Sequence, residues 1–437
     1  MTSALARFTT APWLRSLTEL ALVAFGTTLL ATRHTYGRWG ALLALLGIAL
    51  ALVDLRRHER WPFERADWLP ALAVLLFPLY QSLSILAHGG PPHLFEWTWH
   101  LFYALPVAFV VRRLRPSPAT FPAGLAVGAG AAFALALLQV VSQEMERARG
   151  YWHMVVFGNL ALAIGLLPLL CLEARWFHER LQALAIVGAL AGTMASLLSG
   201  SRGGWLALPF FWLIWYRSRR PRVGGPPPLD RRLLGLFIGC AVAMAVVFGP
   251  GVIKRVEQAG QDIVAYRSGQ VVTSLGMRFE MWGAAIDMAR EHPLTGVGPW
   301  RFGAELAERV EQGKLPRPLL EFEHAHNEFL NILATQGAPG LLALLFSYLG
   351  LALYFERQRR IKRNREAPLA AMGLALVVMF AVFGLSEVMF AHRVSYLLFA
   401  VLIGVCWGFQ QGPSTTRLRY VHREKTVWMP RDLSRVP

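Results

Sequence analysis

Apolar blocks about as long as a bilayer is thick recur along this chain, and they constrain its fold more than any other feature. A helix needs about 20 apolar residues to cross the hydrocarbon core, and lipid offers no partners to free backbone groups, so each block is expected to be a helix. Only 16% of the residues are charged, whereas soluble domains carry roughly a quarter. The sequence therefore predicts an all-α polytopic membrane protein with about 12 transmembrane helices. The blocks lie near residues 14–31, 38–55, 68–87, 94–111, 119–141, 154–172, 181–199, 203–216, 232–250, 338–355, 368–390 and 393–410.

The positive charges are distributed asymmetrically between the connections. The formal net charge is +17, and Lys and Arg gather in every second connection, beginning with the N-terminus. This positive-inside pattern predicts that both termini are cytoplasmic and that the segment 251–337 lies outside. The basic balance thus indicates topology and contact with anionic lipid, not a nucleic-acid partner. The basic connections are 1–15, 56–65, 112–115, 175–180, 217–232, 357–365 and 417–435.

Four regions follow from this layout: predicted transmembrane helices 1–9 in 1–250, an external segment in 251–337, helices 10–12 in 338–411 and a basic cytoplasmic tail in 412–437. The external segment has the periodicity of three short helices. They begin near "SLGMRFEMW", "RFGAELAER" and "NEFLNILATQG", the last with Asn327 as a possible N-cap and Gly337 as a stop. These helices are expected to rest on the membrane surface and to roof a chamber there.

The densest ionisable cluster is "EFEHAHNEFLNILATQGAPG", from Glu321 to Gly340. His326 lies at the predicted start of the third short helix, where the helix dipole disfavours the imidazolium form. A neutral imidazole is what a general base requires. The alternative is an interface histidine that only caps a neighbour.

Two arginines on the predicted outer side can bind an anion. Arg202 is flanked by small residues in "SGSRGGW", and Arg278 opens the "RFEMW" helix. An arginine fork matches phosphate geometry. The alternatives are a snorkelling arginine for Arg202 and an ordinary surface charge for Arg278.

A catalytic metal is not expected. "EFEHAH" contains metal-ligating side chain types, but the chain has no His-Glu-x-x-His motif and no adjacent acidic pair in this segment. Near the last two predicted spans, Glu387 and His392 are ionisable groups at membrane depth. Such groups are costly there and receive a functional interpretation by default, with helix packing as the open alternative.

Several of these motifs resemble the O-antigen ligase family. The spacing of His326-Asn327, Gly337 and Gly340 is similar to the signature of that family. "RGGWL" from Arg202 resembles its Arg-x-x-x-Leu element, and "RFEMW" from Arg278 with the later "HPLTGVG" resembles the start of its large periplasmic loop. The layout of twelve spans with one large loop is similar as well.

This resemblance implies a GT-C-like, inverting and metal-independent glycosyltransferase of the bacterial inner membrane, acting at the periplasmic face in lipopolysaccharide biosynthesis. The donor would be a glycan on undecaprenyl pyrophosphate and the acceptor a sugar hydroxyl of lipid A–core. O-antigen polymerase and protein O-oligosaccharyltransferase differ only in acceptor and stay open, and a lipid-linked glycan transporter is a more distant alternative.

The resemblance also implies the roles of individual residues. His326 would be the base, and Arg202 and Arg278 would hold the donor pyrophosphate. Weaker candidates for lining the sugar path are His324, Arg301, Tyr151 and His153.

Overall fold

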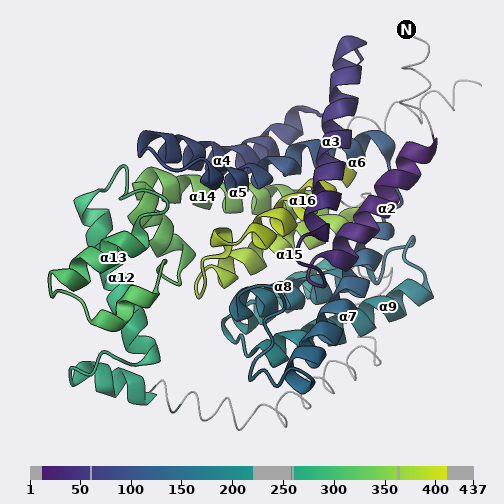
Figure 1. The fold of residues 1–437 in the computed structure, drawn as a ribbon. Coiled ribbons are helices and arrows are strands. Elements are labelled where there is room, and N and C mark those ends of the chain that lie inside the picture. Colours follow the sequence, from purple (N-terminus) through teal and green to yellow (C-terminus); the bar gives the residue numbers. More distant parts are fainter. Residues whose placement is uncertain (1–11, 60–61, 220–256, 258–259, 362–364, 411–437) are drawn as a thin grey trace, which may run out of the picture.

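The computed structural model describes residues 12–59, 62–219, 257, 260–361 and 365–410 (Figure 1). Within these residues the regular structure is helical, and no strand occurs there. The helices before the external segment are α2 (Pro12–Thr28), α3 (Thr35–Arg56), α4 (Trp68–Ala87), α5 (His93–Trp99), α6 (Ala104–Leu114), α7 (Thr120–Val141), α8 (Met154–Leu166), α9 (Glu179–Ser199) and α10 (Leu208–Ser218). The later ones are α12 (Ser274–Glu291), α13 (Phe302–Glu311), α14 (Glu328–Arg360), α15 (Ala367–Phe383) and α16 (Arg393–Phe409).

The predicted apolar blocks coincide with these helices, some of which are continued by a short 3-10 turn. The block at 232–250 and the basic tail at 412–437 lie outside the described residues. In the described part, seven helices are long and apolar enough to cross a membrane, and α15 and α16 are shorter apolar helices. The protein is thus an all-α polytopic membrane protein, as the sequence predicts.

The outer helices present apolar side chains outward. On α3 the exposed residues Leu45, Ile48, Leu52 and Leu55 follow helical spacing and form one stripe. The helices α4 and α14 carry similar exposed leucines. A stripe of this kind is a liability in water and the natural surface in lipid.

The centre of the bundle is formed by α15 and α16 (Figure 1), and nearly all of their residues are buried. Glycines allow close approach of the backbones here. A Cβ on Gly404 or Gly408 would come within 2.6 and 2.7 Å of carbonyl oxygens of α6. Small residues at such contacts are typical of helix packing in membranes.

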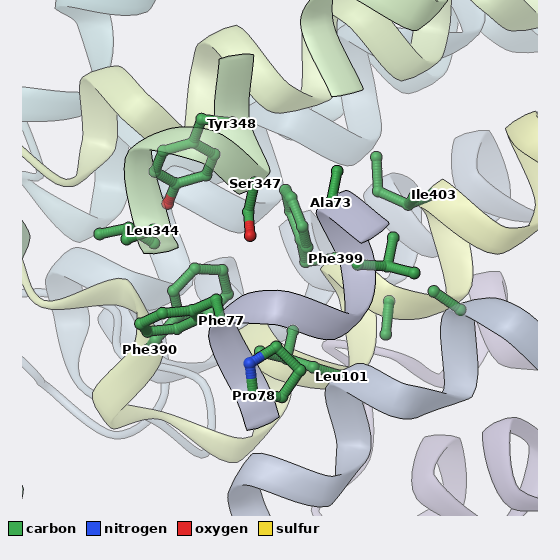
Figure 2. Close-up of a pocket in the computed structure, with 13 residues that line it drawn as sticks. Ala73, Phe77, Pro78, Leu101, Leu344, Ser347, Tyr348, Phe390, Phe399 and Ile403 are labelled. Atoms are coloured by element: carbon green, nitrogen blue, oxygen red, sulfur yellow. The ribbon is translucent and has the colours of Figure 1, made fainter. Parts of the chain in front are cut away.

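A small cavity of about 20 Å³ lies between α4, α14 and α16. Figure 2 shows its aromatic and aliphatic lining, with the hydroxyl oxygens of Ser347 and Tyr348 as its polar groups. About 10–15 Å³ of such volume is needed for one water molecule. The cavity is therefore far too small for a lipid chain.

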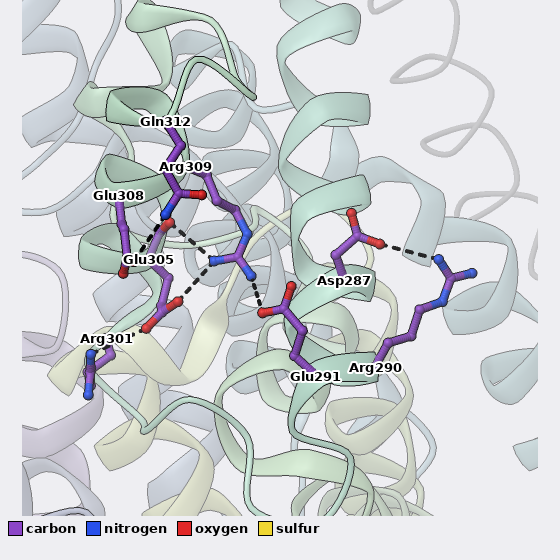
Figure 3. Close-up of polar contacts among 8 residues, drawn as sticks. All are labelled: Asp287, Arg290, Glu291, Arg301, Glu305, Glu308, Arg309 and Gln312. Atoms are coloured by element: carbon purple, nitrogen blue, oxygen red, sulfur yellow. Dashed lines mark hydrogen bonds and ion pairs between the residues drawn. The ribbon is translucent and has the colours of Figure 1, made fainter.

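The predicted external segment forms its own small core beside α14. Met281, Met288, Phe302 and Leu306 are buried together, so α12 and α13 pack as one unit. Arg309 ties the two helices, with its guanidinium 2.9 Å from Glu305 on α13 and 2.6 Å from Glu291 on α12 (Figure 3).

The third short helix and the following apolar block form a single helix, α14, that is interrupted at Gly337. The backbone of Gly337 has φ 70° and ψ −175°, a conformation that glycine adopts far more readily than other residues. The amide of Ala338 donates to the carbonyl of Pro293 across this break. The interruption separates the N-terminal part of α14, which carries Asn327 as its cap, from the apolar part.

Candidate active site

Four histidines surround one fully buried carboxylate, that of Glu387. Its oxygens lie 3.3 Å from Nδ1 of His326, 3.5 Å from Nδ1 of His153 and 3.7 Å from Nε2 of His324. His392 completes the group, with its ring stacked on that of His153 at a centroid distance of 6.2 Å. The cluster brings together the loop before α8, the loop before α14 and the connection between α15 and α16.

The cap of α14 fixes the place of His326. The side chain of Asn327 accepts from the amides of Phe329 and Leu330, each at 3.1 Å, as expected for an N-cap. His326 itself has φ 46°, in the left-handed region that non-glycine residues rarely occupy. Such outliers occur at functional sites more often than elsewhere. The capped turn therefore holds the imidazole in a defined position.

The loop that carries Glu387 is fastened to the same helix end. The amide of Glu328 donates to the carbonyl of Gly384 at 2.7 Å, and the amide of Phe390 donates to the carboxyl of Glu328 at 2.9 Å. The side-chain amide of Asn327 donates to the carbonyl of Leu385 at 3.3 Å. These contacts lock the start of α14 against the 384–392 connection.

Burial and the neighbouring charges set the protonation of this cluster. Burial lowers the pKa of both His324 and His392 to about 4, although Glu387 opposes the shift. Burial also lowers the pKa of His153. Burial raises the pKa of Glu387, but the hydrogen bond from His326 and the charges of the histidines outweigh it and hold that pKa at about 2. Glu387 is thus a carboxylate at neutral pH.

This arrangement prepares His326 for proton transfer. A carboxylate can only accept, so Nδ1 of His326 carries the proton that points to Glu387. The neutral ring then has its lone pair on Nε2, and the carboxylate stabilises the imidazolium that forms when Nε2 takes a proton. A histidine oriented in this way is suited to general-base chemistry.

Arg202 belongs to a segment that packs against the Glu387 loop. The hydroxyl of Ser201 donates to the side chain of Asn159 at 2.9 Å. A Cβ on Gly203 would overlap the hydroxyl of Ser386, the neighbour of Glu387. The residue between these two contacts is the half-buried Arg202, which the fold therefore brings near the cluster.

Arg278 lies on α12, which contacts the loop of His324 and His326. The indole of Trp282 donates to the carbonyl of Ala325 at 3.0 Å, and Ala325 lies between His324 and His326. Residues four apart share a helix face, so the half-buried Arg278 lies on the face of α12 that turns toward this carbonyl.

The remaining sequence candidates differ in their placement. His324 and His153 belong to the cluster, and Tyr151 is an exposed residue two positions before His153. Arg301 is exposed and pairs with Glu305 at 3.3 Å, on the α13 surface (Figure 3). No described contact joins Arg301 to the cluster.

Two members of the cluster were not among the sequence candidates for the site. The sequence marks Glu387 and His392 only as ionisable groups at membrane depth. That observation does not predict which residues their side chains contact. The same pair contributes to a set of possible metal ligands, since ligand atoms of His324, Glu387 and His392 all lie within 4.8 Å of one another.

Fold and site together define a helical membrane protein with a histidine–carboxylate centre where several helix ends meet. Residues 187–345 match the family model described as O-antigen ligase. That segment includes Arg202, Arg278 and His326. This match supports the resemblance of the motifs to the O-antigen ligase family.

Two curated relatives share part of the chain. An uncharacterized protein of Haemophilus influenzae is 24% identical over 270 residues, which cover 59% of this chain and 65% of that protein. The O-antigen ligase of Escherichia coli is 25% identical over 172 residues, or 38% of each chain. The chain thus spans less than two thirds of the length of either relative.

Proposed function

We propose that the protein transfers a glycan from undecaprenyl pyrophosphate to a sugar hydroxyl of lipid A–core at the periplasmic face of the bacterial inner membrane. Both termini are cytoplasmic in this proposal. The observation that carries it is the hydrogen bond between Nδ1 of His326 and the buried Glu387 at 3.3 Å. This pair supplies an oriented base, and His326 lies within the segment that matches the family model.

The reaction assigned to the site is a single displacement. Nε2 of His326 takes the proton of the acceptor hydroxyl while the acceptor oxygen forms a bond to the anomeric carbon of the donor sugar. The bond between that carbon and the phosphate oxygen breaks, and its electron pair leaves with undecaprenyl pyrophosphate. Attack from the opposite side inverts the anomeric configuration.

The leaving group is stabilised by arginine in this proposal. Arg202 and Arg278 belong to two segments that contact the loops of the cluster, and arginine forks bind phosphate oxygens in pairs. Fixed cations at a developing anion can supply the stabilisation that a metal supplies elsewhere. We therefore propose a metal-independent transfer.

The position of the site suits two lipid-anchored substrates. The cluster lies at helix ends, beside α12 and α13, which are too polar to be spans. His153 has a side chain that is 41% exposed, so the cluster is open on one side. A sugar on a lipid carrier can enter there while its carrier stays in the membrane.

The proposal is tested in a bacterial cell that lacks its own ligase and supplies a compatible donor. Wild type is compared with His326→Ala, Arg202→Ala and Arg278→Ala at equal membrane levels. Matched controls are His292→Ala and Arg290→Ala, two exposed side chains of the same segment. We expect long-chain lipopolysaccharide with wild type and controls, and unextended core with accumulated donor in the three site variants.

Other results would redirect the assignment. Longer lipid-linked glycan or a glycosylated protein with unextended core would indicate polymerase or protein transferase activity, with the same base. Normal ligation by His326→Ala would remove His326 as the base. Redistribution of the donor across the membrane without any transfer would indicate a transporter.

A further inference from the structure

The histidine–carboxylate cluster has a second chemical capacity, which the transfer reaction does not use. Ligand atoms of His324, Glu387 and His392 lie within 4.8 Å of one another. Two imidazoles and a carboxylate form a ligand set found around zinc. We propose that these three residues bind one divalent transition-metal ion of the zinc class and that the bound ion inhibits transfer.

The geometry is close to what such an ion requires. Two ligands at 2.0–2.1 Å from a tetrahedral ion are about 3.4 Å apart. Nε2 of His324 is already 3.7 Å from Glu387, and the other separations exceed the tetrahedral value by no more than about 1.4 Å. Side-chain rotations of this size leave the backbone of the two loops in place.

The environment of the ligands favours a metal over additional hydrogen bonds. Nε2 of His392 is buried and makes no hydrogen bond within the described part of the chain. Buried polar atoms normally have a partner. A further ligand is at hand as well, because Nδ1 of His153 lies 3.5 Å from the same carboxylate.

The ligand types select the class of ion. Imidazole suits zinc, copper, nickel and iron, whereas magnesium and calcium prefer sets made entirely of oxygen ligands. Only one of the three groups here offers oxygen. Magnesium is therefore the matched control ion, with the same charge and without affinity for this site.

Inhibition is expected because the ion and His326 share the carboxylate of Glu387. This part of the proposal rests on the function proposed above. Glu387 stabilises the positive charge that His326 acquires when it takes a proton. An ion bound to Glu387 competes with Nδ1 of His326 for that carboxylate, 3.3 Å away, so the ring is no longer oriented with Nε2 free. The cluster therefore serves as a base without the ion and loses that capacity with it.

Binding is measured without any activity assay, on the purified full-length chain in detergent micelles. Co²⁺ is the probe, because its visible spectrum reports coordination geometry, and Zn²⁺ is the competitor. The variants are His324→Gln and His392→Gln, with His292→Gln as the control. The melting temperature of each protein, with and without Zn²⁺, shows that it is folded and whether it binds.

We expect one Co²⁺ per wild-type chain with a tetrahedral spectrum, displaced by Zn²⁺ and indifferent to Mg²⁺. Each of the two ligand variants should bind at least roughly tenfold more weakly, since even outer partners of a ligand are worth 10–100-fold. The control should bind as wild type does. No binding by folded wild type, or binding by His324→Gln and His392→Gln as tight as that of wild type, would overturn the site.

Inhibition is then measured as transfer rate. Zn²⁺ should slow wild type at least roughly tenfold, a chelator should restore it, and His392→Gln should resist Zn²⁺ at the same concentration. A chelator that abolishes transfer would overturn inhibition and the metal-independent reaction together. If no preparation transfers glycan, the proposed function fails, while the Co²⁺ spectrum still decides the metal site.

Discussion

Two buried carboxylates lie near opposite ends of α16, and they are partnered very differently. Asp67 accepts two hydrogen bonds from Arg112, at 2.6 and 3.0 Å, and one from the indole of Trp407 at 2.7 Å. Glu387, near the other end, has imidazoles at 3.3 to 3.7 Å. The 17 residues of α16 separate the two ends by about 25 Å.

The difference in partners indicates a difference in role. Arg112 is always charged, and its fork matches the carboxylate of Asp67. Both side chains are less than one tenth exposed, so this pair has one stable state and joins three elements of the bundle. The partners of Glu387 are imidazoles, which can exist with or without a charge. Burial lowers the pKa of His153, His324 and His392. One cluster is built to hold helices together and the other to change its protonation.

The largest expected effect comes from Glu387→Gln. The amide keeps the shape but no longer enforces Nδ1–H on His326, so the tautomer with a free Nε2 is lost. In a related histidine–carboxylate arrangement, the same exchange lowers kcat about 10⁴-fold. We expect a fall of about 10²–10⁴-fold in the transfer rate of purified protein.

Asp67→Asn provides the control for that measurement. It removes another buried carboxylate, which lies near the other end of α16. Its transfer rate per folded molecule should stay near that of wild type. Equal losses in both variants would mean that Glu387 acts only through stability.

Arg112→Met tests the structural cluster. Removal of one partner leaves Asp67 buried and uncompensated, which typically costs about 3–5 kcal/mol. A lower melting temperature is expected, with the rate per folded molecule retained. Arg113→Met is the comparison, because the Arg113 side chain is 25% exposed and its loss should cost less. Equal shifts would contradict the special position of Arg112.

Asn327→Ala tests what the N-cap of α14 contributes to stability and to transfer. The loss of a cap costs about 1 kcal/mol, and here it also releases Leu385 and the loop of Glu387. Thr273→Ala removes the cap of α12, whose side chain accepts from Gly276 at 3.1 Å. Both variants should melt at similarly lowered temperatures. Only Asn327→Ala should also slow transfer, measured at a temperature where both are folded.

The sequence predicts those features of the molecule that depend on local pattern. Helix positions follow from apolar length, and the capping of α14 by Asn327 follows from residue type. The contact of His326 with Glu387 spans 61 positions and has no local signal. The contact arises because α14, α15 and α16 pack with their ends together. The apolar residues on these helices do not predict which helix packs against which.

Charge distribution shows the same limit. The sequence singles out Arg202 and Arg278 as arginines on the predicted outer side, and in the fold both belong to segments that contact the loops of the cluster. Arg301 is also an arginine of the predicted external segment, but its ion pair with Glu305 holds its side chain at the surface of α13. Which arginine faces a site depends on the pairing of neighbouring side chains, and helical periodicity alone does not determine it.

The smallest expected effect concerns acid stability, measured on protein kept free of metal by a chelator. His392 is faced by Glu387, His153, His324 and His326. Burial is the main cause that lowers the pKa of His392 from 6.5 to about 4. Between pH 4 and pH 6.5, His392 therefore binds more protons in the unfolded chain than in the folded one. The contribution of His392 is thus fully present above pH 6.5 and is lost as pH falls toward 4.

His392→Gln removes this dependence. The melting temperature of the variant should therefore fall less steeply than that of wild type between pH 6.5 and 4, and the two curves should run parallel above pH 6.5. His292→Gln, an exposed histidine, should follow wild type throughout. A slope for His392→Gln as steep as that of wild type would mean that the ring of His392 is protonated in the folded protein. The contrast with the permanently paired Asp67 would then rest on the three other histidines of the cluster.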